Sequence, residues 1–164
     1  MNQQANSAEA GSQYLSFILG GDAYGVDILR VQEIRGWEPV RALPDMPPCM
    51  KGVLDLRGTI VPIIDLRVRF GATDPQYDPT TVIIIVSLEV PERGRQLAGM
   101  VVDAVSGVIE AGEGDIKPPP GGVRGIDGRY LTGMVSSGEG MTVLIDVDQV
   151  LGADQWQQVG GLTA

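Results

Sequence analysis

The stretch Lys51-Gly-Val-Leu-Asp-Leu-Arg-Gly-Thr-Ile-Val-Pro-Ile-Ile-Asp-Leu66 holds two short apolar runs on either side of Arg57 and Gly58. Apolar runs of four to eight residues, rich in Val and Ile and bounded by glycine, are typical of β-strands, so we expect a hairpin here. Pro62 has no backbone N–H to donate, so its strand should lie at a sheet edge or carry a bulge. Arg57 is then either an exposed residue of the hairpin tip or part of a binding site.

Similar segments return later in the chain. Three pairs of segments share one and the same separation: Gly52–Leu54 and Gly133–Val135, Ile64–Asp65 and Ile145–Asp146, Phe70–Gly71 and Leu151–Gly152. Three further pairs share a second, slightly shorter separation: Tyr24–Val26 and Ala98–Met100, Val31 and Val105, Ile34 and Val108. Recurrence at a nearly constant separation indicates a duplicated unit. The alternative is that glycine–apolar patterns recur by chance in a β-rich chain.

The remaining apolar runs are equally short, and 23 glycines and 11 prolines separate them. This punctuation predicts an all-β fold with short helices. Two helices are expected, over Ile28–Gln32 and over Val147–Leu151, the second capped by Asp146 or Asp148. Small units of about five strands usually close on themselves, because closure removes exposed sheet edges, so we expect two five-stranded β-barrels.

The domain boundaries follow from the same pattern. We expect one domain over residues 14–152, made of two barrel subdomains at about residues 14–71 and 80–152, with the short C-terminal helix packing on the first. The polar, proline-containing segment 72–79 would join them. Residues 1–13 are polar, without a basic start or an apolar block, and predict a disordered tail instead of a secretion signal. Residues 153–164 are expected to form a flexible tail.

The composition excludes several partners and chemistries. Twelve Lys and Arg residues against 21 Asp and Glu give a net charge of −9 without any basic run, so neither nucleic acid nor an anionic membrane surface is an expected partner. The longest strongly apolar run, Val82–Val86, is far shorter than the roughly 20 residues that span a bilayer. The single Cys49 fits a small core residue in a reducing, cytoplasmic compartment. Histidine, the commonest general base and metal ligand, is absent.

Three carboxylates are the strongest candidates for chemistry. Asp65, Asp103 and Asp146 each follow an apolar run, and such a trio could hold a divalent metal ion in a hydrolase. Asp65 and Asp146, however, occupy the same position in the two units and would lie in different barrels, which favours hydrogen bonding to neighbouring turns. Nucleophile-elbow and phosphate-loop patterns are also missing. We therefore expect no enzymatic activity, no metal and no other cofactor.

The segment Val31–Trp37 indicates a different role. It mixes Glu33 and Arg35 with apolar Val31, Ile34 and Trp37. One interpretation is a helix end that continues into a strand with alternating burial. The other is a protein-binding surface, since interfaces favour an aromatic or arginine anchor within an apolar patch.

Five long segments can be compared with known families: Tyr14–Gly20, Tyr24–Gly36, Lys51–Leu66, Val101–Ser106 and Tyr130–Gly133. Together they closely resemble the CheW family of chemotaxis coupling proteins, and the resemblance extends from Gln13 to Gly152. It implies two five-stranded SH3-like β-barrels and a non-enzymatic adaptor. Such an adaptor links methyl-accepting chemotaxis receptors to the histidine kinase CheA, whose regulatory domain has the same fold, and builds receptor–kinase arrays with rings that could include further copies of itself. The protein would then be cytoplasmic and recruited to receptor clusters at the membrane.

The resemblance also implies site residues. Receptor binding would involve Val31, Glu33, Gly52, Arg57, Val105 and Val108, in a groove between the barrels. Lys117 matches a basic residue of a kinase contact, but Gly121–Val123 replaces the aromatic residue that often follows it. Asp55 stands where asparagine is usual, and Pro91–Gln96 is more charged than in many members. A detached regulatory domain of the kinase, or a CheW-like domain of another chemosensory-type pathway, remains an alternative.

Overall fold

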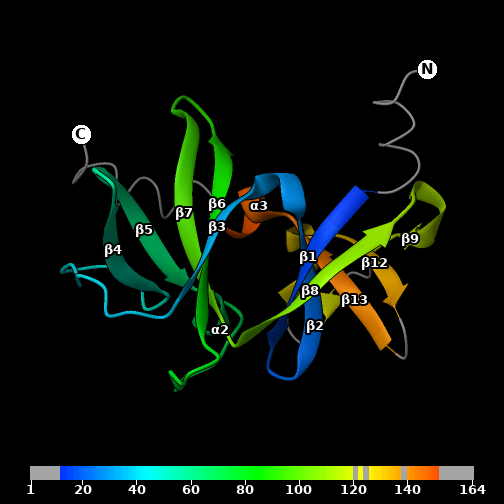
Figure 1. Cartoon of the computed structure of the whole chain (residues 1–164), viewed down its shortest axis with the longest axis horizontal. Coiled ribbons are helices and arrows are strands. Elements are labelled where there is room, and N and C mark those ends of the chain that lie inside the picture. Colours follow the sequence, from blue (N-terminus) through cyan, green and yellow to red (C-terminus); the bar gives the residue numbers. More distant parts are fainter. Residues whose placement is uncertain (1–11, 120–121, 124–125, 138–139, 152–164) are drawn as a thin grey trace.

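The computed structural model describes residues 12–119, 122–123, 126–137 and 140–151, and these residues are mostly β (Figure 1). Two sheets stand side by side, and each curves into an SH3-like barrel. The first barrel has the strand order β3-β6-β7-β5-β4, with β3 (Val31–Gly36), β4 (Met50–Leu56), β5 (Thr59–Asp65), β6 (Val82–Val90) and β7 (Gly94–Val102). The second has the order β8-β1-β2-β13-β12-β9, with β1 (Ser12–Leu19), β2 (Asp22–Asp27), β8 (Ala104–Ala111), β9 (Ile116–Lys117), β12 (Leu131–Ser137) and β13 (Gly140–Ile145).

Short elements complete the fold. The α-helices are α2 (Leu66–Arg69) and α3 (Val147–Val150); the 3₁₀ turns are η1 (Ile28–Arg30), η2 (Glu113–Asp115) and η3 (Gly128–Tyr130). A small ribbon pairs β10 (Gly122–Val123) with β11 (Ile126–Asp127). The all-β fold class with short helices is therefore confirmed, and the second sheet adds the two-residue strand β9 to the five expected.

The two barrels repeat one pairing scheme. In the first, parallel strands β5 and β7 place Ile63 opposite Gly99; in the second, parallel strands β13 and β2 place Leu144 opposite Gly25. Ile63 and Leu144 have the longer of the two separations found in the sequence, and Gly25 and Gly99 have the shorter one. These separations therefore relate equivalent positions of two sheets with the same strand order.

The sheets do not follow the predicted boundaries at residues 14–71 and 80–152. The hairpin β1–β2 joins β8, β12 and β13 in the second barrel, whereas β6–β7 joins β3, β4 and β5 in the first. Each barrel thus combines the opening hairpin of one sequence unit with the later strands of the other. The chain crosses between barrels twice, from β2 through η1 to β3 and from β7 through Asp103 to β8.

Alternating side chains divide the core into layers. In β6, Ile83 and Ile85 point into the first barrel, while Ile84 and Val86 face a central core that both sheets share. From the second barrel, β1 contributes Phe17 to this central core. Because burial of apolar surface stabilises every element that shares it, the central core holds the two barrels together.

Two glycines allow close packing inside the barrels. A Cβ built on Gly99 would lie 2.6 Å from Ile63 Cδ1, and one on Gly25 would lie 2.9 Å from Leu144 Cδ2. Each glycine therefore leaves room for the large side chain of the neighbouring parallel strand. This steric requirement explains why the glycine recurs at the same position of both units.

The helix expected over Ile28–Gln32 is wrong in extent. Only Ile28–Arg30 forms a single 3₁₀ turn, in which the Asp27 side chain accepts a hydrogen bond from Leu29 N at 2.9 Å. From Val31 onward the chain pairs with β6 instead, because β-branched residues such as Val31 and Ile34 favour the strand.

The second predicted helix is confirmed. Asp146 caps α3 by accepting from Asp148 N at 3.0 Å, and α3 packs against β6 of the first barrel. Its counterpart α2, at the equivalent place in the first sequence unit, was not predicted, although the repeat itself contained the signal.

Pro62 occupies a position where its missing N–H costs nothing. Its partner Val53 exchanges both backbone hydrogen bonds with Arg41, so this pair of β4 and β5 is not hydrogen-bonded. Pairing with β7 begins only at Ile63, and the neighbouring strand β4 has a bulge between Met50 and Gly52. The strand of Pro62 thus neither forms an edge of the sheet nor carries the bulge, so this prediction is wrong; the bulge lies in the partner strand β4.

Candidate binding surface

An ion pair spans the open side of the first barrel. Strands β3 and β4 are the two edges of this sheet. Arg57, at the turn between β4 and β5, donates from Nη2 to Glu33 Oε1 of β3 at 3.0 Å. Arg35 Nη1 donates to the second carboxylate oxygen of Glu33, also at 3.0 Å. The hydrogen bond from Arg57 is the main cause that lowers the pKa of Glu33 below its usual value, and Arg35 adds to it.

The two charges of this ion pair are unequally exposed. The Arg57 side chain is 74% exposed, whereas Glu33 is 27% exposed. Arg57 therefore keeps most of its guanidinium available to a partner while Glu33 fixes its direction.

Arg57 has an unusual backbone conformation. Its φ is +52° and that of Gly58 is +91°, in a two-residue loop between the paired residues Leu56 and Thr59. Positive φ at both central residues is the pattern of a type I′ turn, and Asp55 Oδ1 supports the turn by accepting from Gly58 N at 2.9 Å. A left-handed conformation costs a residue with a Cβ about 1–3 kcal/mol, and such strain is concentrated at functional sites.

Four apolar residues line the two strands that begin just after the barrel crossings. Val31 of β3 and Val105 of β8 are partly buried against the central core. Further along the same strands, Ile34 is 45% exposed and Val108 is 52% exposed. Large exposed aliphatic side chains at equivalent positions of two edge strands are candidate contacts for a partner. Ile34 was not among the predicted site residues, although its equivalence to Val108 in the sequence repeat could have identified it.

Gly52 is not part of this exposed surface. It is buried in β4 with a φ of +149°, and a Cβ at this position would collide with the carbonyl group of Arg41. The space that this glycine leaves is filled by the backbone of the chain's own Arg41 segment, which pairs with Val53.

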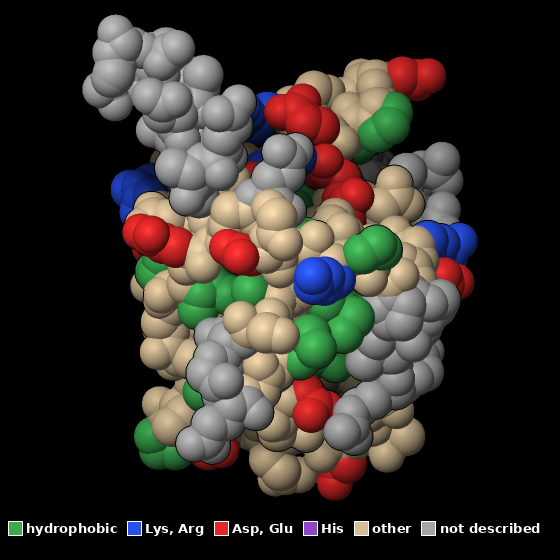
Figure 2. Space-filling model, turned by 90° about the vertical axis from the view of Figure 1, so that its right-hand side faces the viewer, with side chains coloured by type: hydrophobic (Ala, Val, Ile, Leu, Met, Phe, Trp, Pro, Cys, Tyr) green, Lys and Arg blue, Asp and Glu red, His purple; other side chains and the backbone are tan. Residues whose placement is uncertain are grey.

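Lys117 lies in the other sheet from Glu33, Gly52 and Arg57, and Val105 and Val108 lie at the opposite edge of its own sheet. It is exposed in β9, the outermost strand of the second barrel, opposite Met134 of β12. Figure 2 shows this end of the molecule, where hydrophobic side chains gather near the middle of the face with basic and acidic side chains around them. The structure thus separates the predicted kinase contact from the Glu33–Arg57 ion pair.

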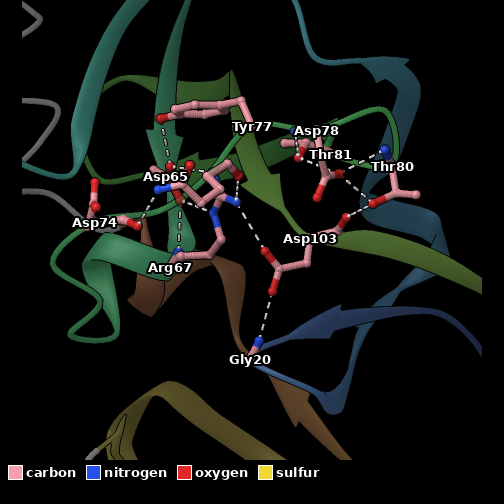
Figure 3. Close-up of polar contacts among 10 residues, drawn as sticks. Gly20, Asp65, Arg67, Asp74, Tyr77, Asp78, Thr80, Thr81 and Asp103 are labelled. Atoms are coloured by element: carbon pink, nitrogen blue, oxygen red, sulfur yellow. Dashed lines mark hydrogen bonds and ion pairs between the residues drawn. The ribbon is translucent and has the colours of Figure 1, made fainter.

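The three candidate carboxylates have structural partners, and Figure 3 shows those of Asp65 and Asp103. Asp65, with no exposed surface, caps α2 and binds Arg67 through Nε at 2.9 Å and Nη2 at 3.0 Å. Asp103 accepts from Arg67 Nη1 at 3.0 Å and from Gly20 N at 2.8 Å. Asp146 caps α3. Within the ranges described, no group of three or more acidic or cysteine side chains is placed to hold a metal ion.

Tyr77 completes the network around Asp65. Its hydroxyl donates to Asp65 Oδ2 at 3.0 Å, and its ring stacks on Trp37 with the ring centroids 4.2 Å apart. Burial and then the negative charge of Asp65 raise the pKa of Tyr77 to about 12. The phenol must be protonated to donate, so the charged, deprotonated form is disfavoured in the folded state.

Stability should therefore fall at alkaline pH. The contribution of Tyr77 is complete below its ordinary pKa of 10.0 and is lost as the pH rises through about 12. Thermal melting followed from pH 9 to 12 should show a decrease that is smaller in Tyr77→Phe than in the wild type. In a spectroscopic titration of tyrosinate formation, this variant should also lack the component that ionises at the highest pH. Equal pH dependence of both proteins would contradict the assignment.

Comparisons with known proteins identify the family. The model of the CheW-like domain matches residues 13–155. A "Chemotaxis protein CheW" from Klebsiella aerogenes is 41% identical over 145 residues, which cover 88% of this chain and 84% of the relative. One from Rhizobium meliloti is 29% identical over 154 residues, covering 94% and 96%. The crystal structure of the scaffolding protein TtCheW from Thermoanaerobacter tengcongensis matches with a TM-score of 0.78 and 32% identity, covering 88% of this chain and 95% of the other.

These matches agree with the fold. They span both barrels and both crossings, and they include Glu33, Val105 and the turn that carries Arg57. The part of the chain that the structure describes contains no helix long and apolar enough to cross a membrane. The chain belongs to the CheW-like family of chemotaxis proteins.

Proposed function

We propose that this protein is a non-enzymatic adaptor that couples methyl-accepting chemotaxis receptors to the histidine kinase CheA. Membership of the CheW family supports this role, since coupling receptors to CheA is what CheW does. The protein would act in the cytoplasm and be recruited to receptor clusters at the membrane. It would help to build the receptor–kinase array, in which it could also contact further copies of itself.

The observation that carries the proposal is the Glu33–Arg57 ion pair, which starts from the edge strand that also carries exposed Ile34. Val31 and Val105 are partly buried against the central core, and Ile34 and Val108, further along the same two edge strands, are more exposed. Arg57 supplies an exposed, oriented charge at the edge. An apolar patch with a few fixed charges suits a helical receptor tip, because apolar burial provides affinity while the charges determine orientation. Gly52 would contribute indirectly, by allowing Arg41 to pack against β4.

The kinase would bind elsewhere, at the edge of the second barrel. Lys117 is exposed on β9, and an edge strand offers unpaired backbone groups in addition to its side chains. Separate surfaces would allow the adaptor to hold receptor and kinase at the same time. The aromatic residue that often follows this contact in the family is absent from Gly121–Val123, so Lys117 carries a larger share of the proposed interface.

Co-sedimentation tests the proposed function. The purified protein should pellet with receptor-containing membranes, and not with the same membranes prepared without receptors. The kinase should pellet only when the adaptor is present. Lys117→Glu should still bind receptors but recruit less kinase, because it reverses the charge at the kinase contact only. The proposal would be overturned if the wild-type protein bound neither the receptors nor the kinase.

A CheW-like regulatory role in another chemosensory-type pathway is the second candidate. The same barrels would then serve a different kinase and a different receptor set. Binding to the kinase of one array and not of another, measured in parallel, separates the two roles.

A further inference from the structure

Each of the two crossings between the barrels contains a residue that forms an ion pair with a short helix. At the first crossing, Arg30 of η1 binds Asp148 of α3, with Nη1–Oδ1 at 2.9 Å and Nη2–Oδ2 at 2.7 Å. At the second, Asp103 binds Arg67 of α2 at 3.0 Å. In both cases a residue of the crossing segment contacts one of the two short helices that follow the last strand of each sequence unit.

The two ion pairs occupy equivalent places with opposite polarity. Arg67 and Asp148 are each the second residue of their helix, α2 and α3, and are equivalent in the sequence repeat. Leu29, the neighbour of Arg30, is in the same way the repeat equivalent of Asp103. At the first crossing the helix supplies the carboxylate and the crossing supplies the arginine, whereas at the second crossing these roles are exchanged. The duplicated fold thus keeps a link at both crossings while changing the residues that make it.

Each link has additional partners that bridge the barrels. Arg30 Nη1 also donates to the carbonyl oxygen of Ser87 in β6, and Asp148 accepts from Glu89 N of the same strand. Asp103 accepts from Gly20 N, in the turn between β1 and β2 of the second barrel. The geometry of each crossing is therefore determined from both sides.

The two edge strands that flank the proposed receptor surface begin at these links. Val31 follows Arg30 directly, and Val105 lies just beyond Asp103. A shift of either crossing would move the strand that begins there, and with it the apolar contacts on that strand. Packing against the central core restrains Val31 and Val105 only partly, since both remain partly exposed.

We propose that Arg30–Asp148 and Arg67–Asp103 are positioning pairs that set the separation of β3 and β8, and through it the affinity for receptors. The effect on receptor affinity, which is the second step, rests on the proposed function. The effect on the separation of β3 and β8, which is the geometric step, does not. None of the four residues needs to contact the receptor. The bidentate Arg30–Asp148 pair is the better target, because its side chains are 30% and 26% exposed and neither is fully buried.

Distance measurement tests the geometric step directly. Spin labels at Gln32→Cys on β3 and Ser106→Cys on β8, in a Cys49→Ala background, report the separation by pulsed electron resonance. Both labelled positions are exposed. Arg30→Met and Asp148→Asn should each broaden or shift the distance distribution, and Arg30→Lys should change it less, because lysine keeps the charge but loses the bidentate contact. Arg95→Met is the matched control: it breaks an exposed pair with Glu89 within the β6–β7 hairpin and should change nothing.

Receptor binding by the unlabelled variants tests the second step. Arg30→Met and Asp148→Asn should bind receptor membranes about tenfold more weakly, with Arg30→Lys intermediate and Arg95→Met near the wild type. Circular dichroism confirms that each variant folds, and having two variants of one pair keeps the test valid if one fails. An unchanged distance in both variants overturns the proposal. A changed distance with unchanged binding overturns its link to receptor affinity. If the wild type itself does not bind receptor membranes, the result counts against the proposed function and not against the positioning pairs.

Discussion

Replacing Arg57 with asparagine should remove receptor-dependent kinase activation while leaving the protein at least as stable as before. The side chain lost is the exposed charge of the proposed receptor surface. The turn, however, needs positive φ at this position, where φ is +52°. Asparagine tolerates that conformation, and Asn followed by Gly is among the best sequences for a type I′ turn.

Replacing a residue that stabilises the fold lowers the stability of the protein, whereas Arg57→Asn should raise it slightly. Relief of backbone strain of about 1 kcal/mol corresponds to a rise in melting temperature of roughly 2–4 °C in a protein of this size. Loss of the ion pair with Glu33 offsets only a small part of this gain, because an ion pair with so exposed an arginine contributes little to stability. Melting by circular dichroism and kinase assays with receptor membranes measure the two effects separately.

Two variants serve as controls for this result. Arg57→Lys keeps a charge but loses the planar guanidinium, so it should retain part of the activation. Arg95→Met, at an exposed ion pair in another hairpin, should retain all of it. A fall in melting temperature of Arg57→Asn together with loss of activation would show that Arg57 stabilises the barrel and would contradict its assignment to the receptor surface.

Replacing Arg67 with methionine should destabilise the protein by about 3–5 kcal/mol, since removing one partner of a buried ion pair leaves the other charge uncompensated. Arg67 side-chain exposure is only 6%, and Asp65 has none. The substitution deletes both hydrogen bonds to Asp65, one to Asp103 and one from Nη1 to the carbonyl oxygen of Gln76 at 2.6 Å. It also removes the guanidinium that lies 4.9 Å from the centroid of the Tyr77 ring.

Urea unfolding gives the free energy of this change. The double variant Asp65→Asn with Arg67→Met should be more stable than Arg67→Met alone, because it removes the buried charge that the single variant leaves behind. A single variant within about 1 kcal/mol of the wild type would show that water or a shifted side chain replaces the guanidinium. Since whole domains are stable by only about 5–15 kcal/mol, the expected loss is a large part of the total.

The local structure could be predicted where the sequence pattern is local. Short Val- and Ile-rich runs indicated the strands, and Asp146 indicated the cap of α3, because both signals arise from neighbouring residues. The composition of each barrel could not be predicted in this way. Apolar alternation shows that β1–β2 is a half-buried hairpin, but it does not show which of two similar sheets the hairpin joins.

The same limit applies to the candidate site. The resemblance to CheW provided the positions of Glu33 and Arg57, and the structure adds that they form an ion pair across the open side of a barrel. Arg67 was not singled out, because arginine is usually exposed and its burial here depends on segments that are distant in the sequence. The close approach of the Arg41 carbonyl to Gly52 could not be identified without the fold, because the two residues lie in different segments.

The exchange of hairpins between the barrels has a consequence for synthesis of the chain. The hairpin β1–β2 leaves the ribosome well before its parallel partner β13. At ordinary rates of translation the hairpin waits on the order of ten seconds with an unpaired edge. Neither half of the gene encodes a barrel that can close by itself, so the nascent protein depends on completion of β13, and on protection of that edge until then, to reach its native state.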